Sequence, residues 1–225
     1  VNYFIQYHLH LQLSEAAEYA HQNGIILKGD IPIGVNRNSV DTWVSPELYN
    51  MDMQAGAPPD MFAIKGQNWE LPSYNWEKME ETGFDWWKKR FQQMSNYFDT
   101  FRIDHILGFF RIWQIPIEQE EGIMGYLNPS VPIHIDEFYQ KGIHFDYNRF
   151  CLPYITDSVI WENFGDDANW VKINCIDIID GWILRLKPIC NTQKKVLEMF
   201  NKGLISEKIK WGLFDLISNV LFFEA

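Results

Sequence analysis

The sequence predicts an α/β fold with parallel strands, and three observations support this class. Apolar side chains recur at helical spacing over residues 3–22, and Asn23 with Gly24 ends the predicted helix. The stretch GIILKGDIPIGV, which follows directly, is apolar, β-branched and bounded by glycine, as buried strands are. An amphipathic helix over residues 77–97, which can break at Gly83, leads to a second buried strand near residues 100–103. The chain therefore contains a βαβ unit.

The composition predicts a packed globular chain and argues against one class of partner, the nucleic acids. The chain has 225 residues, 47% hydrophobic and 22% charged, and a formal net charge of −11. It contains no dense Lys/Arg cluster, so we expect no nucleic-acid partner. It also lacks an apolar run long enough to cross a membrane. The three cysteines are odd in number, far apart and without metal-ligand spacing, which favours a reducing, cytoplasmic location.

Residues 36–76 predict a long structured loop over a functional site. The segment is rich in Asn, Pro, Gly and Asp, with few periodic signals, but its many aromatic side chains make it too apolar for disorder. It follows the carboxyl end of the first strand, the end at which parallel α/β folds gather their active sites. Within it, Trp69 and Tyr74 are aromatic plates near polar side chains, a combination that recognises sugar rings. The alternative is that they are scattered surface aromatics.

The stretch FDTFRIDHILGFF, residues 98–110, carries the candidate catalytic groups. Arg102 and Asp104 are two residues apart, so they share one strand face, and Asp104 lies at the carboxyl edge. An Asp kept ionised by a neighbouring guanidinium can act as a glycosidase nucleophile. The alternative is that Arg102 and Asp104 form a structural ion pair with no role in catalysis. His105 faces the site if the strand has already turned, and Asp30 is either a turn-former or a second carboxylate at the rim.

The chain divides into a predicted barrel portion, residues 1–116, and an insertion or subdomain, residues 117–225. In the second part GWILRLKPIC predicts one or two strands, NTQKKVLEMFNKG predicts a short helix, and WGLFDLISNVLFF fits either element. The chain opens within an apparent helix and stops within an apparent strand. We therefore expect a fragment of a longer protein.

Three blocks resemble the 4-α-glucanotransferases, also called amylomaltases or disproportionating enzymes, and most of all their long cytosolic type. The blocks are KGDIPIGVNRNSVDTWVSPELY, GAPPDMFAIKGQNWELPSYNW and FRIDHILGFFRIWQIP, in the order and spacing of that family. The resemblance implies a (β/α)8 TIM barrel, of which this chain holds only a part. It also implies retaining transfer of α-1,4-glucan segments, with maltose, maltodextrin or a heteroglycan as substrate and with no cofactor or metal.

The resemblance assigns roles to six residues. Asp104 matches the catalytic nucleophile and Arg102 the arginine that supports it. Four further residues match probable glucan contacts, His105 at the −1 sugar: Asp41, Trp69, Tyr74 and His105. The general acid/base of the family lies in a downstream G-E-D-L-G-like block that these 225 residues lack. The fragment alone is therefore expected to be inactive.

Three other readings fit the sequence. One is a non-catalytic glucan-binding remnant that makes no use of Asp104. Another is a hydrolase of the α-amylase clan, which shares the R-x-D strand, although the GQNWELPSY loop argues against it. The last is an unrelated α/β domain.

Overall fold

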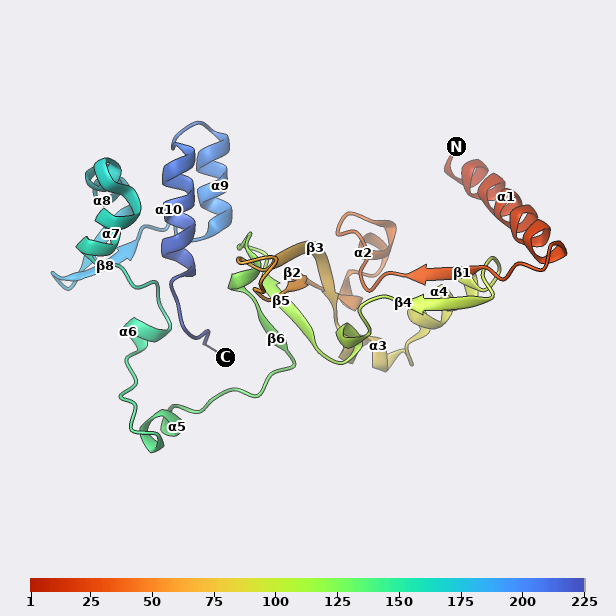
Figure 1. The fold of residues 1–225 in the computed structure, drawn as a ribbon, viewed down its shortest axis with the longest axis horizontal. Helices are drawn as coiled ribbons and strands as arrows, with labels where there is room; N and C mark the ends of the chain where they lie inside the picture. Colours follow the sequence, from red (N-terminus) through yellow and green to blue (C-terminus); the bar gives the residue numbers. More distant parts are fainter. Residues whose placement is uncertain (225) are drawn as a thin grey trace. The chain divides into compact units, whose positions relative to one another are not determined.

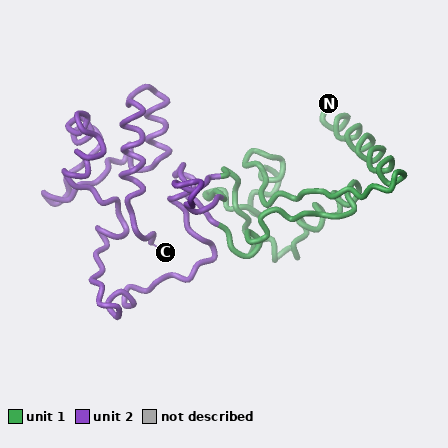
Figure 2. The backbone as a smooth tube through the Cα atoms, in the orientation of Figure 1, with its two compact units in different colours: residues 1–55, 69–112 green, residues 56–68, 113–225 purple. Residues whose placement is uncertain are grey.

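A computed structural model describes residues 1–224, which form a mixed α/β structure (Figure 1). The Cα trace divides into two compact units, shown in separate colours in Figure 2. Unit 1 comprises residues 1–55 and 69–112, and unit 2 comprises residues 56–68 and 113–225. Each unit has its own cluster of buried hydrophobic side chains.

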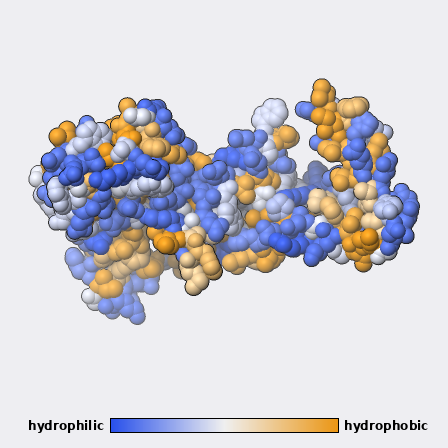
Figure 3. Space-filling model, turned by 45° about the horizontal axis from the view of Figure 1, so that its top comes forward, coloured by the Kyte–Doolittle hydropathy of each residue, from blue (hydrophilic) through white to orange (hydrophobic). Residues whose placement is uncertain are grey.

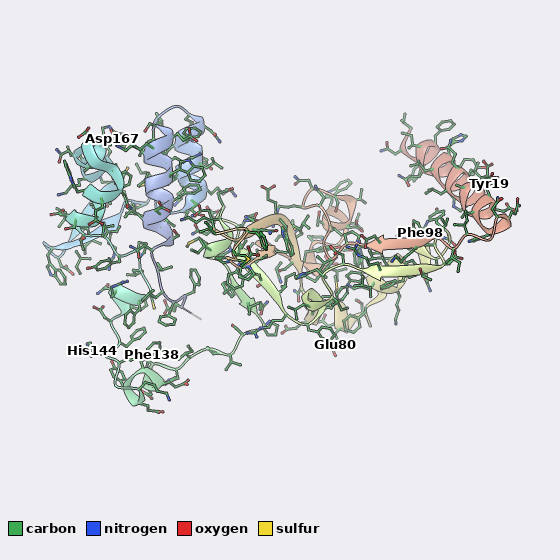
Figure 4. The ribbon with its side chains drawn as sticks, in the orientation of Figure 1. Tyr19, Glu80, Phe98, Phe138, His144 and Asp167 are labelled. Carbon is green, nitrogen blue, oxygen red and sulfur yellow. The ribbon has the colours of Figure 1, made fainter. Side chains whose placement is uncertain are left out.

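Unit 1 is built on the parallel pairing of two short strands. Strand β1 (Lys28–Ile31) pairs with β4 (Thr100–Ile103), which confirms the predicted parallel arrangement. Gly29 leaves room for the Phe98 ring, because a Cβ there would lie 2.7 Å from ring carbons of Phe98, the residue labelled beside the two strands in Figure 4. The expectation that β4 is buried is wrong for this chain. Phe101 is half-buried and the other β4 residues are exposed.

Helix α1 (Asn2–Gln22) confirms the predicted N-terminal helix and its end at Asn23, which is followed by Gly24 at φ 71°. Its buried residues are Ala17 and Ala20. Its apolar face is otherwise exposed, with Tyr3 at 93% and Phe4 at 67%, and orange side chains mark this helix in Figure 3.

The segment 36–76 contains regular structure, so the expectation of a long loop is wrong. It holds α2 (Val40–Val44), the 3₁₀ helix η1 (Pro46–Leu48), β2 (Tyr49–Ala57) and β3 (Gln67–Tyr74). These strands belong to a sheet of order β3-β2-β5-β6, completed by β5 (Ile112–Pro116) and β6 (Tyr126–Asn128). A Cβ on Gly56 would lie only 2.1 Å from the Gln67 carbonyl oxygen, so the glycine that weakens the strand signal is required by close backbone contact.

The predicted helix over 77–97 is interrupted where the sequence places Gly83. Helix α3 (Trp76–Glu81) ends there and α4 (Asp85–Met94) begins after it. Gly83 and Phe84 both have positive φ, 61° and 60°, and this left-handed backbone interrupts the right-handed helix. The 3₁₀ helix η2 (Ile106–Phe109) follows β4. The core of unit 1 gathers Ile31, Ile33, Tyr49, Tyr74, Met79, Trp87 and Ile112.

Unit 2 is mainly helical. Its elements after β6 are α5 (Ile135–Gln140), α6 (Tyr147–Phe150), α7 (Asp157–Phe164), α8 (Ala168–Cys175), β7 (Ile176–Ile179), β8 (Ile183–Leu186), α9 (Gln193–Asn201) and α10 (Glu207–Ser218), with short 3₁₀ helices at Gly122–Met124 and Gly165–Asp167. Strand β8 and helix α9 confirm the predictions for those stretches, and α10 shows that WGLFDLIS is helical. Phe164, Val171, Leu213 and other apolar side chains of α7–α10 form the core.

Gln193 fixes the segment that follows β5. Its side chain is fully buried, and its Oε1 accepts hydrogen bonds from the backbone N–H groups of Glu120 and Glu121, each at 2.9 Å. Its Nε2 donates to Glu121 Oε2 at 2.7 Å. Burial raises the pKa of Glu121, although the Lys65 ammonium and the bond from Gln193 act in the opposite direction. The ionised form of Glu121 is therefore disfavoured on folding.

We expect Glu121→Gln to stabilise unit 2 increasingly as pH rises. A carboxyl whose pKa is raised on folding contributes stability below its ordinary pKa of about 4.3, and that contribution is lost as pH rises through the folded-state pKa. Glutamine does not ionise, so it escapes this loss. Hydrogen exchange of α9 amides in the full-length protein, at acidic and neutral pH, measures the difference. Glu198→Gln, an exposed glutamate of α9, is the control. Equal protection of wild type and Glu121→Gln at both pH values contradicts the prediction.

Candidate functional site

Three charged side chains meet where β1 and β4 end. The parallel register places Asp30 opposite Arg102, and Asp104 follows β4 on the same face as Arg102. Arg102 bridges the two carboxylates, with Nη2 3.0 Å from Asp104 Oδ1 and Nε 3.4 Å from Asp30 Oδ1. The Arg102 and Asp30 side chains are 58% exposed and that of Asp104 is 50% exposed. A carboxylate held by a guanidinium and open to solvent can act as a nucleophile.

Backbone contacts fix both ends of this strand pair. At the carboxyl end, the Asp104 N–H donates to the Ile31 carbonyl at 3.0 Å and continues the ladder one residue beyond β4. At the other end, Asp99 Oδ2 accepts from the Leu27 N–H at 2.9 Å and lies 2.9 Å from His21 Nε2. These bonds lower the pKa of Asp99, the bond from Leu27 most of all. The position of Asp104 is thus set by the strand register.

His105 turns the chain away from the strand. Its backbone is left-handed, with φ 49° and ψ 53°, and it precedes η2. Its ring meets Trp69 edge to face, with centroids 5.0 Å apart at 86°. A Cβ on Gly108 would lie 2.7 Å from His105 Cδ2 and 3.1 Å from Ile33 Cγ1, so the glycine leaves room for the imidazole. Of the two orientations considered for His105, the structure shows the one in which the strand has already turned.

Tyr74 lies inside an aromatic cluster. It is 5% exposed and packs against Tyr49, Trp76, Trp86 and Trp87. Its hydroxyl oxygen accepts from Arg90 Nη1 at 3.4 Å. Burial raises the pKa of the Tyr74 phenol, while the Arg90 cation lowers it. Tyr74 therefore stays protonated at neutral pH, and its predicted glucan contact stays a prediction.

Asp41 is connected to the same cluster through a tryptophan. Asp41 lies in the first turn of α2, and its Oδ1 accepts from Trp86 Nε1 at 3.1 Å. The Arg90 guanidinium lies over the Trp86 ring, 5.2 Å from the ring centroid, and donates to the Pro32 carbonyl at 3.1 Å. Because Pro32 directly follows β1, Arg90 ties the cluster to the carboxyl end of that strand.

The predicted site residues thus form two groups. Arg102 and Asp104 are brought together as predicted, and His105 meets Trp69. Asp41 and Tyr74 share the cluster around Trp86. Sequence reasoning did not select Arg90 or Trp86, although their i,i+4 spacing in an amphipathic helix was a visible signal. For Asp30 it left open a turn role or a place at the rim of the site, and the structure pairs this residue with Arg102.

Within residues 1–224 no helix is long and apolar enough to cross a bilayer. The same residues contain no cluster of three or more His, Cys, Asp or Glu side chains with the arrangement of a metal site.

Comparison with known proteins relates the chain to one family. A family model described as 4-alpha-glucanotransferase matches residues 1–192. The 4-alpha-glucanotransferase DPE2 of Oryza sativa subsp. japonica is 44% identical over 229 residues, which cover 98% of this chain and 24% of that protein. The 4-alpha-glucanotransferase of Aquifex aeolicus is 38% identical over 128 residues, 54% of this chain and 26% of that protein.

A solved structure agrees with this relation. The amylomaltase from Streptococcus agalactiae in complex with acarbose matches with a TM-score of 0.52 and 29% sequence identity, over 75% of this chain and 38% of that chain. The chain spans about a quarter of the length of the curated relatives named above. Because the family model matches most of its length, the chain belongs to the 4-alpha-glucanotransferase family.

Proposed function

We propose that the whole protein is a 4-α-glucanotransferase that moves α-1,4-glucan segments between maltodextrins through a covalent glycosyl-enzyme. The observation that carries the proposal is the bridge of Arg102 between Asp30 and Asp104, at the carboxyl ends of two parallel strands in a member of this family. The likeness to an amylomaltase solved with acarbose supports an α-glucan as substrate.

In the proposed reaction, a carboxylate oxygen of Asp104 attacks the anomeric carbon of the donor. The glycosidic bond breaks, and the leaving 4-oxygen takes a proton from a general acid. The 4-hydroxyl of a second glucan then attacks the glycosyl-enzyme, loses its proton to the same group and releases Asp104. Arg102 holds the Asp104 carboxylate in the orientation required for attack. Neither step requires a cofactor.

We propose that the general acid/base lies outside these 225 residues. In retaining enzymes the second carboxyl lies about 5–5.5 Å from the nucleophile. Asp30 is next to the site, but its Oδ1 is engaged by the same guanidinium that holds Asp104, so it is not placed as a separate group facing the nucleophile. The 225-residue piece alone would then be inactive, and the complete (β/α)8 barrel would include β1 and β4 as two neighbouring strands.

We propose sugar contacts for the remaining predicted residues. Trp69 offers a half-buried ring beside His105, and Asp41 offers an oxygen that is not committed to Trp86. Tyr74 would act indirectly, by holding the Arg90 and Trp86 side chains in position. The proposed setting is cytoplasmic, which agrees with free thiols at Cys151, Cys175 and Cys190.

We expect Asp104→Asn in the full-length protein to lower disproportionation of maltotriose by at least about a thousandfold, because the nucleophile is removed with little change of shape. Glucose release and chain-length redistribution are the readouts. Asp85→Asn is the matched control, since Asp85 is an exposed carboxylate paired with Lys89 in the same unit. Full activity of Asp104→Asn would show that the Arg102–Asp104 pair is structural.

Arg102→Lys is expected to lower kcat about tenfold to a hundredfold while the protein stays folded. The guanidinium reaches two carboxylates through separate nitrogens, whereas an ammonium is a single point, so Asp104 would lose its fixed orientation. Lys89→Ala, which breaks the comparable exposed pair with Asp85, is the control. Wild-type kcat in Arg102→Lys would mean that Arg102 contributes only charge.

A further inference from the structure

Unit 2 contains a cavity that the proposed reaction does not use. It has a volume of about 520 Å³ and lies between the residues around α6, the start of α7, and the β7–β8 hairpin; Figure 1 labels α6, α7 and β8. That volume is within the range of small-molecule sites, about 300–1,000 Å³. Its lining combines two aromatic side chains, Tyr154 and Trp182, with charged and amide side chains.

Trp182 directly follows a tight turn. Asp180 and Gly181 both have positive φ, 53° and 80°, and the Trp182 N–H donates to the Ile179 carbonyl at 3.2 Å. Two successive positive φ angles define the type I′ turn that joins twisted antiparallel strands, here β7 and β8. Trp182 is 77% exposed at the cavity, an unfavourable position for a large aromatic ring in an isolated molecule. The ring is therefore available for stacking.

A donor without a partner lies beside the second ring. The Arg149 guanidinium stacks on Tyr154, with Cζ 4.4 Å from the ring centroid. Its Nη1 is buried and makes no hydrogen bond to any described residue. A buried donor without a partner is costly, and an acceptor brought by a ligand would remove that cost.

The charges of the cavity favour a neutral ligand over an anion. Lys172 Nζ is 2.7 Å from Asp157 Oδ1, and Arg185 donates to Asn148 Oδ1. Asp146 Oδ1 accepts from the backbone N–H of Arg149. Three cations and two carboxylates thus line the cavity, most of them already partnered, so they leave both donors and acceptors at fixed positions. Such a mixture beside an exposed aromatic plate suits the hydroxyls and the apolar face of a sugar ring.

We propose that this cavity is a glucan-binding site in unit 2, with Trp182 stacked on a glucose ring and Arg149 Nη1 donating to a sugar oxygen. The inference rests on the proposed function for the choice of α-1,4-glucan as ligand. Its two carboxylates are engaged by Lys172 and by the Arg149 backbone N–H, so the proposed site binds glucan without turnover.

The test uses the full-length protein carrying Asp104→Asn, so that the probe, maltoheptaose, is not consumed. Hydrogen exchange is followed with and without the sugar. Protection is expected in peptides covering residues 146–157 and 178–186, with a half-saturating concentration that rises about tenfold or more in Trp182→Ala. Trp182→Phe should retain most of the protection. Trp170→Ala, which removes a partly exposed tryptophan outside the cavity, should leave it unchanged.

Two results would overturn the inference. One is the absence of protection in these peptides at millimolar maltoheptaose. The other is protection by inorganic phosphate and not by maltoheptaose, which would show an anion site. Disproportionation by the protein with Asp104 intact is measured in parallel. Activity without protection refutes only the second site, whereas the absence of activity refutes the proposed function.

Discussion

The parallel pairing of β1 with β4 is the constraint on which the candidate site depends. It places Asp30 beside Arg102 and lets one guanidinium reach two carboxylates that are far apart in the sequence. A shift of one residue in register would turn the Arg102 side chain to the other face, away from Asp30. The hydrogen bonds from the Leu27 N–H to the Asp99 carboxylate and from the Asp104 N–H to the Ile31 carbonyl resist such a shift from both ends. The arrangement of Asp30, Arg102 and Asp104 thus depends on the strand register, whereas the aromatic cluster forms the surroundings of these three side chains.

The elements predicted correctly are those with local signals. Helix α1 with its Asn23–Gly24 end, the break at Gly83 and helix α9 all follow from periodicity and capping. Strands β2 and β3 were missed because β2 has three consecutive buried residues, β3 contains Pro72, and Gly56 answers a contact that is invisible in the sequence. The β7–β8 hairpin had a strong signal, Asp180 before Gly181 between β-branched stretches, which the sequence analysis did not use.

The candidate site was likewise predictable only where its contacts are local in the sequence. Asp104 directly follows β4, two residues after Arg102, so their proximity on one face follows from a period of two. The role of Asp30 required the register between two strands, and that of Arg90 required the packing of α4 against the residues after β1. Such contacts join distant parts of the chain, and local patterns do not contain them. The resemblance to a family supplied what the pattern lacked, but only for positions within the matching blocks.

The orientation of the His105 ring depends on the absence of a side chain at Gly108. A single methyl group there would occupy the space of the His105 ring edge and of Ile33. The imidazole would have to rotate, and its edge-to-face contact with Trp69 would change with it. The direction in which His105 can offer a proton or a lone pair is therefore set by the one hydrogen atom that glycine carries in place of a side chain. Gly108 has no reactive group, but the space that it leaves determines the orientation of the His105 ring.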